Sequence, residues 1–374
     1  MNTPHGLGLA LALLLVTTSY AAAQRNDVPR SDDFYDSHFH LTNYVQHGPD
    51  VSSVLRIMGT RVGRSTLFGI PFQQTWAYAN SGDYAPSYYL DTDAPLYYYS
   101  FTDAWIAMQY RSLPQAAQAR FEPMITGFNP ADMYAAEHIR RVLATFPGVF
   151  SGIGEFSIHK EFVSSKAAGE GASLTNPALD SILTFAGEAG LVVILHNDID
   201  RPFAKANVEP VYLTQMKALL RRHPETTIIW AHVGLGRIVH PAQSQGTAGA
   251  GAAERSEGQL GIVESILQDP AMRHVYFDIS WDEVAKYVVA TPQTVQRTAA
   301  VINRHPDRFL FATDAMAPAD SASYYAVFEI YAPLWRALTA EASVKTRMGN
   351  FARLFDAARI KVRAWESAHP SAGR

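Results

Sequence analysis

The sequence predicts an α/β fold, and within that class a (β/α)₈ barrel with an aromatic-rich insertion after its second strand. Short apolar, β-rich runs alternate with helix-like segments along the 374-residue chain, and this alternation is typical of a parallel sheet with right-handed crossovers. Eight such runs in one series favour a closed barrel. An open doubly wound sheet is the alternative, but it would normally carry a glycine-rich phosphate turn after the first strand. The chain reads His38-Phe39-His40-Leu41-Thr42-Asn43 there instead.

The expected elements follow one another in a regular series. Several predicted helices open with a proline next to a capping residue, as in Asn176-Pro177 and Thr291-Pro292, which is a helix-start pattern. The predicted strands are 34–40, 65–70, 121–128, 149–156, 191–196, 226–232, 274–280 and 309–314, and the predicted helices are 130–145, 177–189, 210–223, 260–267 and 292–303.

Two segments interrupt this series. Residues 76–105 contain ten aromatic side chains, and so long a connection between strands two and three is typical of a lid or binding insertion. An extra helix that packs its rings against the barrel wall is the alternative. Residues 242–258, rich in glycine and alanine, are expected to form a flexible loop.

Composition narrows the possible chemistry. With 48% hydrophobic and 18% charged residues, the chain has the make-up of a packed globular protein. A net charge of -4 gives no basic field for phosphates, so nucleic-acid binding is disfavoured. The chain has 13 histidines and no cysteine, which excludes thiol catalysis, disulfides, iron–sulfur clusters and cysteine-bound zinc. Any metal must therefore be bound by imidazole and carboxylate groups.

The N-terminus has the pattern of a signal peptide. The apolar run 7–16 is too short to span a bilayer, and it leads to Ala21-Ala22-Ala23, small residues of the kind that signal peptidase requires. We expect residues 1–23 to be removed and residues 24–374 to form a single barrel domain, periplasmic or secreted and not bound to a membrane. A disordered or core-packing N-terminus is the alternative.

Ionisable residues recur at the carboxyl ends of the predicted strands. In an extended chain the side chains of His38 and His40 point to one face, so both can reach a single metal. The carboxyl ends of barrel strands converge on one face, where active sites lie. Imidazoles and carboxylates gathered there would be costly to bury unless a cation lay among them. The predicted metal ligands are His38, His40, Glu155, His196, His232 and Asp314.

Those six residues, and the ending Gly349-Asn350-Phe351-Ala352-Arg353-Leu354-Phe355, resemble the amidohydrolase superfamily and its amidohydrolase-related branch. That branch includes barrel-fold metal hydrolases and aromatic-acid decarboxylases. The resemblance implies that His38, His40 and Asp314 bind one metal. His196 and His232 would hold a second, or supply one ligand and one transition-state donor. Glu155 stands where many members carry a carboxylated lysine. It could bridge two ions, bind one, or orient a neighbour.

The ligand set suits one or two divalent ions, with Zn²⁺ preferred over Mn²⁺, Fe²⁺ or Co²⁺. We expect hydrolysis of an amide, ester, lactone or phosphoester by metal-activated water. Asp314 would transfer the proton, and the ion or His232 would polarise the scissile oxygen. The second reading is a non-oxidative decarboxylase of an aromatic or unsaturated acid, since Asp36 precedes the histidine pair as in several of those enzymes. The third is a non-enzymatic binding protein.

Further polar residues are expected around this site. Asn197, Asp198 and Asp200 follow His196 and could bond to ligands or substrate, as could His159 and Lys160 after Glu155. Asp278, Trp281 and Asp282 would line the mouth of the barrel. Arg237 would pair with an anionic group of the substrate or, as the alternative, be a solvated loop charge. We expect His223, His274 and His305 to cap helices or lie at the surface. The expected partner is a small-molecule substrate, and pairing through outer helices would give a homo-oligomer.

Overall fold

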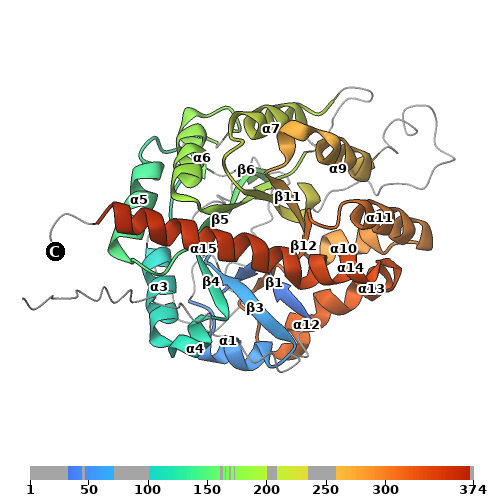
Figure 1. The fold of residues 1–374 in the computed structure, drawn as a ribbon, viewed down its shortest axis with the longest axis horizontal. Helices are drawn as coiled ribbons and strands as arrows, with labels where there is room; N and C mark the ends of the chain where they lie inside the picture. Colours follow the sequence, from blue (N-terminus) through green and yellow to red (C-terminus); the bar gives the residue numbers. More distant parts are fainter. Residues whose placement is uncertain are drawn as a thin grey trace, which may run out of the picture. The chain divides into compact units, whose positions relative to one another are not determined.

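Parallel strands run through the centre of the fold (Figure 1). In order across the sheet they are β1 (Phe34–Asp36), β3 (Val62–Leu67), β4 (Phe121–Ile125), β5 (Gly152–Lys160), β9 (Val192–Asn197), β10 (Ile228–Trp230), β11 (Val275–Ile279) and β12 (Phe309–Phe311). Neighbours in the sheet are successive strands of this series, and each of these pairs is parallel. Beyond β1 and β12 the two ends meet. Ser37 N donates to Phe311 O (3.3 Å), and β13 (Ala315–Met316) pairs with β2 (Phe39–His40). The predicted (β/α)₈ barrel is confirmed.

This computed structural model describes residues 33–43, 47–70, 101–160, 163–164, 166–167, 170–171, 173–199, 209–234 and 258–370, all within the compact unit Asp32–Arg374. The predicted signal peptide 1–23 lies outside the described residues. So do most of the aromatic-rich insertion and nearly all of the predicted flexible loop. Among the described helices, none has the length and apolar character that crossing a bilayer requires.

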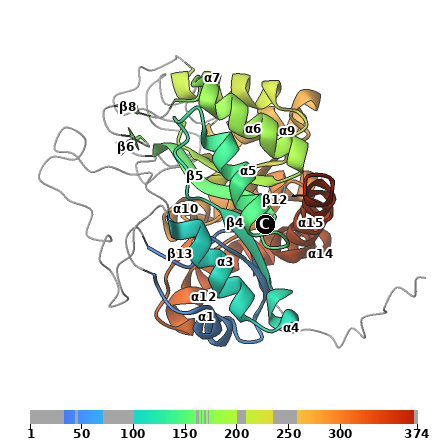
Figure 2. The same cartoon turned by 90° about the vertical axis from the view of Figure 1, so that its left-hand side faces the viewer.

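Helices pack around the strands, as the two views show (Figure 2). The helix α6 (Pro177–Ala189) begins where predicted, with Asn176 Oδ1 accepting from Ala178 N. The helix predicted from residue 130 begins only at Ala135, because Asn129 and Asp132 each accept a backbone N–H two residues on and hold the chain in turns. The other helices are α1 (Val51–Met58), α3 (Thr102–Ser112), α4 (Gln115–Gln118), α5 (Ala135–Thr145), α7 (Val211–Arg222), α9 (Gly258–Gln268), α10 (Asp282–Val288), α11 (Pro292–Arg304), α12 (Ser321–Ile330), α13 (Ala332–Ala337), α14 (Ala340–Val344) and α15 (Asn350–Ala368).

Alternate residues of the strands enter two separate apolar clusters. In β9, Val193 and Leu195 pack in the larger cluster with the surrounding helices. Val192 and Ile194 belong to a smaller cluster with Phe68, inside the barrel. Because successive strand residues face opposite sides, this alternation fixes which positions near a strand end point inward. His196 follows Ile194 by two residues and faces the interior.

The C-terminal helix α15 crosses the strands (Figure 1) and closes the end of the barrel where they begin. Its Asn350 donates to Pro306 O (2.7 Å) and Phe309 O (2.8 Å), and Arg353 donates to Asp307 O (2.8 Å). Phe355 on the same helix packs into the inner cluster. The Gly-Asn-X-X-Arg-Leu-Phe sequence is thus a structural clamp that leaves the carboxyl end of the barrel open for chemistry.

Candidate metal centre

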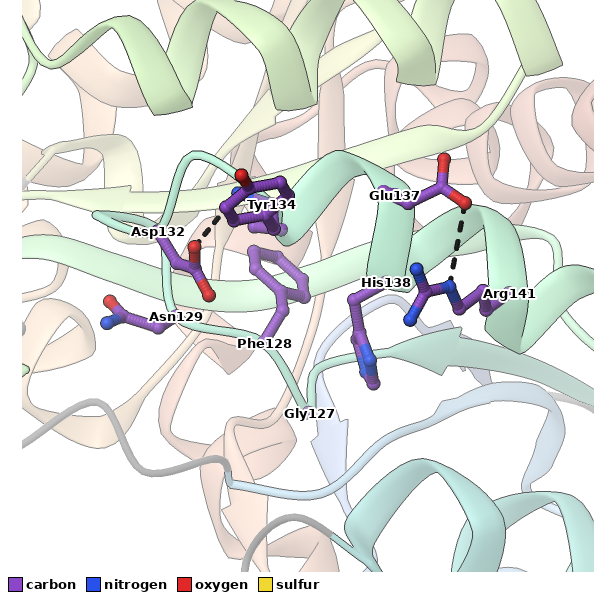
Figure 3. A pocket seen from close by; sticks show the side chains of 9 residues that line it. Gly127, Phe128, Asn129, Asp132, Tyr134, Glu137, His138 and Arg141 are labelled. Carbon is purple, nitrogen blue, oxygen red and sulfur yellow. Dashed lines mark hydrogen bonds and ion pairs between the residues drawn. The ribbon is translucent and has the colours of Figure 1, made fainter.

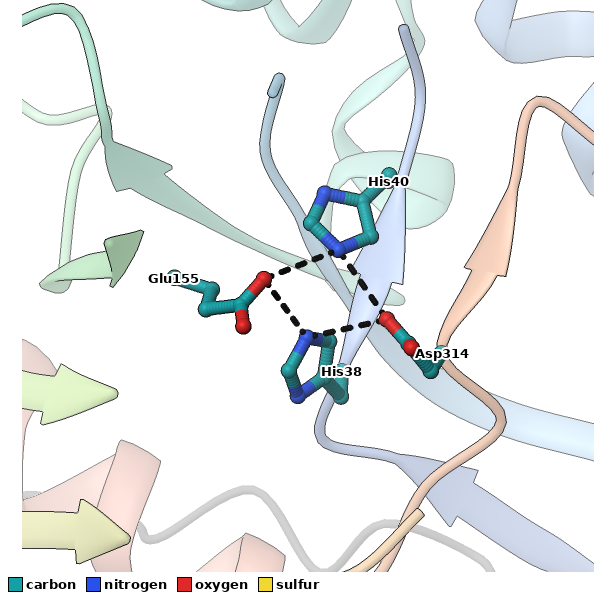
Figure 4. Close-up of side chains that lie close together, drawn as sticks. All are labelled: His38, His40, Glu155 and Asp314. Atoms are coloured by element: carbon teal, nitrogen blue, oxygen red, sulfur yellow. Dashed lines mark hydrogen bonds and ion pairs between the residues drawn. The ribbon is translucent and has the colours of Figure 1, made fainter. Parts of the chain in front are cut away.

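Four of the six predicted ligands meet around one point (Figure 4). Glu155 Oε2 lies 3.3 Å from His38 Nε2 and 3.4 Å from His40 Nε2. Asp314 Oδ1 lies 3.2 Å from the same two nitrogens. Ligands around an ion with bonds of about 2.0–2.2 Å are separated by about these distances. The four side chains are arranged as a metal would require.

The second oxygen of Glu155 faces the other two histidines. Glu155 Oε1 lies 2.5 Å from His196 Nδ1 and 3.6 Å from His232 Nε2. His196, His232 and Glu155 form a second group able to hold a cation. All six predicted residues are therefore gathered in one cluster, and one carboxylate lies between two pairs of imidazoles.

Simple alternation along the strands would not give this arrangement. Glu155 is two residues after Ile153, which packs outside the barrel, so in a regular strand its side chain would also point outward. The pairing of β5 with β9 contains a β-bulge. Ile153 pairs with Val193 and Phe156 pairs with Leu195, so β5 advances by three residues where β9 advances by two. This β-bulge, which contains Gly154 at φ 111°, turns the carboxylate inward.

His232 needs a similar departure from the strand. The strand β10 ends at Trp230, earlier than predicted, and the chain then turns through two left-handed residues, His232 at φ 55° and Val233 at φ 57°. Left-handed backbone at a non-glycine residue costs about 1–3 kcal/mol, which the surroundings must offset. Asp278 Oδ1 accepts the His232 backbone N–H at 2.8 Å and holds this conformation.

The outward-facing nitrogens of the histidines are engaged away from the centre. His38 Nδ1 bonds to Asp278 Oδ2 (3.2 Å), His40 Nδ1 to Gly69 O (3.1 Å) and His232 Nδ1 to Ser280 Oγ (2.7 Å). Each of these three rings therefore presents Nε2 to the centre. His196 differs, because its Nε2 faces Asp198 Oδ1 (2.9 Å) and its Nδ1 faces Glu155. Partners of this kind fix the orientation and tautomer of metal-binding histidines.

The electrostatics of the site also favour a cation. Burial would lower the pKa of His38, but the carboxylates of Asp314 and Glu155 and the bond with Asp278 hold it well above its ordinary value. Burial would raise the pKa of Asp314, yet the neighbouring His38 and His232 hold it well below its ordinary value. The pocket stabilises positive charge among ionised carboxylates, and this is what a divalent ion would supply.

Two carboxylates, Asp278 and Asp36, are buried and differ from the roles predicted for them. Asp278 was expected at the mouth of the barrel, but its side chain is fully buried between His38 and His232. Asp36 is also fully buried, and burial raises its pKa to about 6. Its oxygens accept bonds from His38 N, Thr313 N, Thr313 Oγ1 and Tyr324 OH, so it joins the ends of β1 and β12. The sequence does contain one sign that Asp278 is buried, because it is the single charged residue in the otherwise apolar strand Val275–Ile279.

The remaining predicted residues are less central. Asp198 orients His196 as expected. His223 is the C-terminal cap of α7, the first of its two predicted roles, and it is buried and pairs with Asp180 Oδ1 at 2.7 Å. Asp200, Arg237 and the Lys160 side chain lie outside the described residues.

A separate hollow of about 380 Å³ opens beside α5 (Figure 3). Its polar lining includes Asn129, Asp132, His138 and Arg141, and Glu137 pairs with Arg141 (3.5 Å). None of the six predicted ligands lines it, so the hollow is distinct from the histidine cluster.

The chain is similar to known proteins both in sequence and in fold. The family model described as amidohydrolase matches residues 35–357. The crystal structure of an amidohydrolase II is 15% identical with a TM-score of 0.50, covering 86% of this chain and 99% of that one. Also similar is a putative 2-pyrone-4,6-dicarboxylic acid hydrolase from Pseudomonas putida, with 14% identity and a TM-score of 0.48 over 87% of this chain and 98% of that one. A 2,6-dihydroxybenzoate decarboxylase from Rhizobium has 14% identity and a TM-score of 0.48 over 87% of this chain and 99% of that one. No curated protein matches. Because the family model spans most of its length, the chain belongs to the amidohydrolase family.

Proposed function

We propose that the protein is a metal-dependent hydrolase that cleaves an amide, ester, lactone or phosphoester bond of a small molecule. The observation that supports this best is the position of Glu155. One of its oxygens faces His38 and His40, and the other faces His196 and His232. A carboxylate between two pairs of imidazoles suits a bridge between two divalent ions, for which Zn²⁺ is our first candidate.

The six candidate ligands form two groups that share Glu155. His38, His40, Asp314 and Glu155 Oε2 would hold one ion, and His196, His232 and Glu155 Oε1 the other. A cation bound in such a site lowers the pKa of water from about 15.7 towards about 7.

Asp314 is our candidate for proton transfer. Its Oδ1 faces the first histidine pair, whereas its Oδ2 lies 3.9 Å from His232 Nε2. Oδ2 is thus the oxygen placed to take a proton from water and return it to the leaving group. His232 Nε2, where it is not a ligand, would orient the scissile oxygen.

Decarboxylation is the competing reaction. The sequence feature that favoured it was Asp36, whose carboxylate is fully buried and accepts hydrogen bonds from Thr313 and Tyr324. Asp36 therefore gives decarboxylation no specific support, and Glu155 favours hydrolysis.

We also propose that the protein is exported, on the basis of the apolar run 7–16 and Ala21-Ala22-Ala23. The mature protein would begin at Gln24, which N-terminal sequencing of the protein from the periplasm or medium would test.

The function is tested by metal analysis together with a substrate screen. We expect two zinc ions per wild-type chain, hydrolysis of at least one ester, lactone, amide or phosphoester, and loss of activity on chelation that added zinc reverses. Glu155→Gln replaces one oxygen with an amide donor, so it should bind one ion at most.

Glu366→Gln is the matched control, because Glu366 bonds to Gly148 N and Arg363 on α15. It should retain both ions. Full activity without metal would refute the proposal. Release of carbon dioxide from an aromatic acid, with no hydrolysis of any substrate, would assign the protein to the decarboxylases.

A further inference from the structure

Asp278 lies behind two of the candidate ligands, His38 and His232, and is not itself one of the six predicted ligands. It sits in β11, in the apolar sequence Val-Tyr-Phe-Asp-Ile, and its side chain is fully buried. Its Oδ2 bonds to His38 Nδ1 at 3.2 Å. Its Oδ1 accepts both the His232 backbone N–H, at 2.8 Å, and the Ser280 hydroxyl.

These bonds determine which nitrogen of each ring faces the centre. An ionised carboxylate only accepts hydrogen bonds, so His38 Nδ1 must carry the proton. Ser280 gives its single proton to Asp278 and must accept at its oxygen from His232 Nδ1, 2.7 Å away. Both rings therefore keep Nε2 for the centre, where His38 Nε2 faces Glu155 (3.3 Å) and Asp314 (3.2 Å) and His232 Nε2 faces Glu155 (3.6 Å).

The backbone contact adds a second constraint. His232 has φ 55°, and its N–H points at Asp278 Oδ1. This bond holds His232 in its left-handed conformation just after β10, with the ring turned into the barrel. One carboxylate thus sets the tautomer of the histidine between β1 and β2 and the backbone conformation of the histidine after β10.

We propose that Asp278, together with Ser280, is a positioning residue that orients His38 and His232 for metal binding. This inference rests on the metal site of the proposed function. Beyond the choice of ligands, the proposal predicts that Nδ1 of each of these two rings carries the proton and that Nε2 is free to bind the metal.

The substitution Asp278→Asn tests the proposal, because the asparagine side chain has almost the same size and shape as that of aspartate. The backbone N–H of His232 cannot become an acceptor, so the amide oxygen must remain beside it. The amide NH₂ then occupies the place of Oδ2 and donates to His38 Nδ1. His38 must move its proton to Nε2, where it blocks the metal.

Zinc affinity measured by chelator competition on the full chain is the first readout. Loss of a group that orients a ligand typically weakens metal binding about 10- to 100-fold, and we expect a loss in this range for Asp278→Asn. Asp103→Asn is the matched control, because Asp103 is also buried and accepts the backbone N–H groups of Thr126 and Gly127. It should bind zinc as wild type does.

The second readout is ¹⁵N NMR of histidine-labelled, zinc-loaded protein, which distinguishes a protonated from a coordinated ring nitrogen. Wild type should show His38 with a protonated Nδ1 and a coordinated Nε2, and Asp278→Asn should lose this pattern. Ser280→Ala keeps the carboxylate and should change the His232 signals alone, which a general loss of stability would not do.

The outcomes separate the two proposals. If wild type binds no zinc, the proposed function fails. If wild type binds zinc and Asp278→Asn binds it equally well with unchanged His38 signals, the role of Asp278 is overturned and the metal site stands. Should Asp278→Asn not fold, Ser280→Ala decides, and unchanged His232 signals with unchanged zinc affinity would overturn the proposal.

Discussion

Gly154 is the position where a minimal substitution should disturb the site most. It precedes Glu155 in the bulge of β5 and has φ 111°. A Cβ added there would lie 2.2 Å from the carbonyl oxygen of Ile194, and 3.0 and 3.1 Å from the carbonyl carbon and nitrogen of the same residue. These are backbone atoms of β9, so no rotation of a side chain can relieve the contact. Gly154→Ala therefore has to push β5 away from β9.

The cost has two parts. Side-chain-bearing residues in such backbone conformations cost about 1–3 kcal/mol, and forcing an extra carbon into a packed interior costs about 1–3 kcal/mol. The sum, about 2–6 kcal/mol, is a large share of the 5–15 kcal/mol by which domains are typically stable. At about 2 °C per kcal/mol for a domain of this size, the Tm should fall by about 4–12 °C. Since β5 carries Glu155 and β9 carries His196, 2.5 Å apart, metal binding should weaken as well.

Thermal unfolding and zinc competition on the purified variant would measure both effects. Gly148→Ala is the matched control, because Gly148 also has positive φ (82°) but an added Cβ would meet nothing closer than Arg363 Nη1 at 3.7 Å. It should pay the backbone cost alone, about 1–2 kcal/mol, and keep its zinc. A Gly154→Ala protein with the Tm and zinc affinity of wild type would show that the bulge does not position Glu155.

Two further predictions concern catalysis and pH. Asp314→Asn should lower kcat by about 10²- to 10⁴-fold, the range for loss of a general acid–base group, and a kcat within threefold of wild type would remove Asp314 from proton transfer. Burial raises the pKa of Asp180, but bonds from His223 and Arg222 outweigh it and leave the pKa below its ordinary value. Its stabilising effect is therefore complete above the unfolded pKa of about 3.9 and is lost as pH falls through the folded value. Because the side chain is partly exposed, Asp180→Asn should cost at most about 1 kcal/mol in urea unfolding at pH 7. This difference should vanish near pH 2, and a constant difference at both pH values would contradict the ion pair.

Much of the fold could be predicted because its signals are local. The alternation of apolar runs and helical segments, and proline at the starts of α6 and α11, depend on neighbouring residues. The inward direction of His196 could also be predicted locally, because it lies two residues after the inward-facing Ile194 near the end of an apolar strand. The clamp by α15 was not predicted, because Asn350 acts on Pro306 and Phe309, which are more than 40 residues away.

The partners of the ligands were harder to predict for the same reason. Asp278 lies 240 residues from His38 in the sequence and 3.2 Å away in the fold. Nothing in the sequence pairs the two, although a charged residue within an apolar strand marks Asp278 as unusual. Asp36 was assigned to a possible reaction because of its spacing from His38, but it bonds to Thr313, 277 residues away.

The site forms where the strands stop being regular. Alternation brings only every second residue of a strand inward, so convergence of ligands from several strands requires departures from it. The bulge at Gly154 supplies one departure for Glu155, and left-handed residues at His232 and Asp314 supply two more, each with φ 55°. Each left-handed residue is held by a bond to a residue in or beside another strand, since His232 N donates to Asp278 in β11 and Asp314 N donates to His38 O (2.9 Å) between β1 and β2. The ligands are thus placed by a few cross-strand bonds, whereas stability comes mostly from the apolar clusters. Changes to those bonds should therefore weaken metal binding more than they weaken the fold.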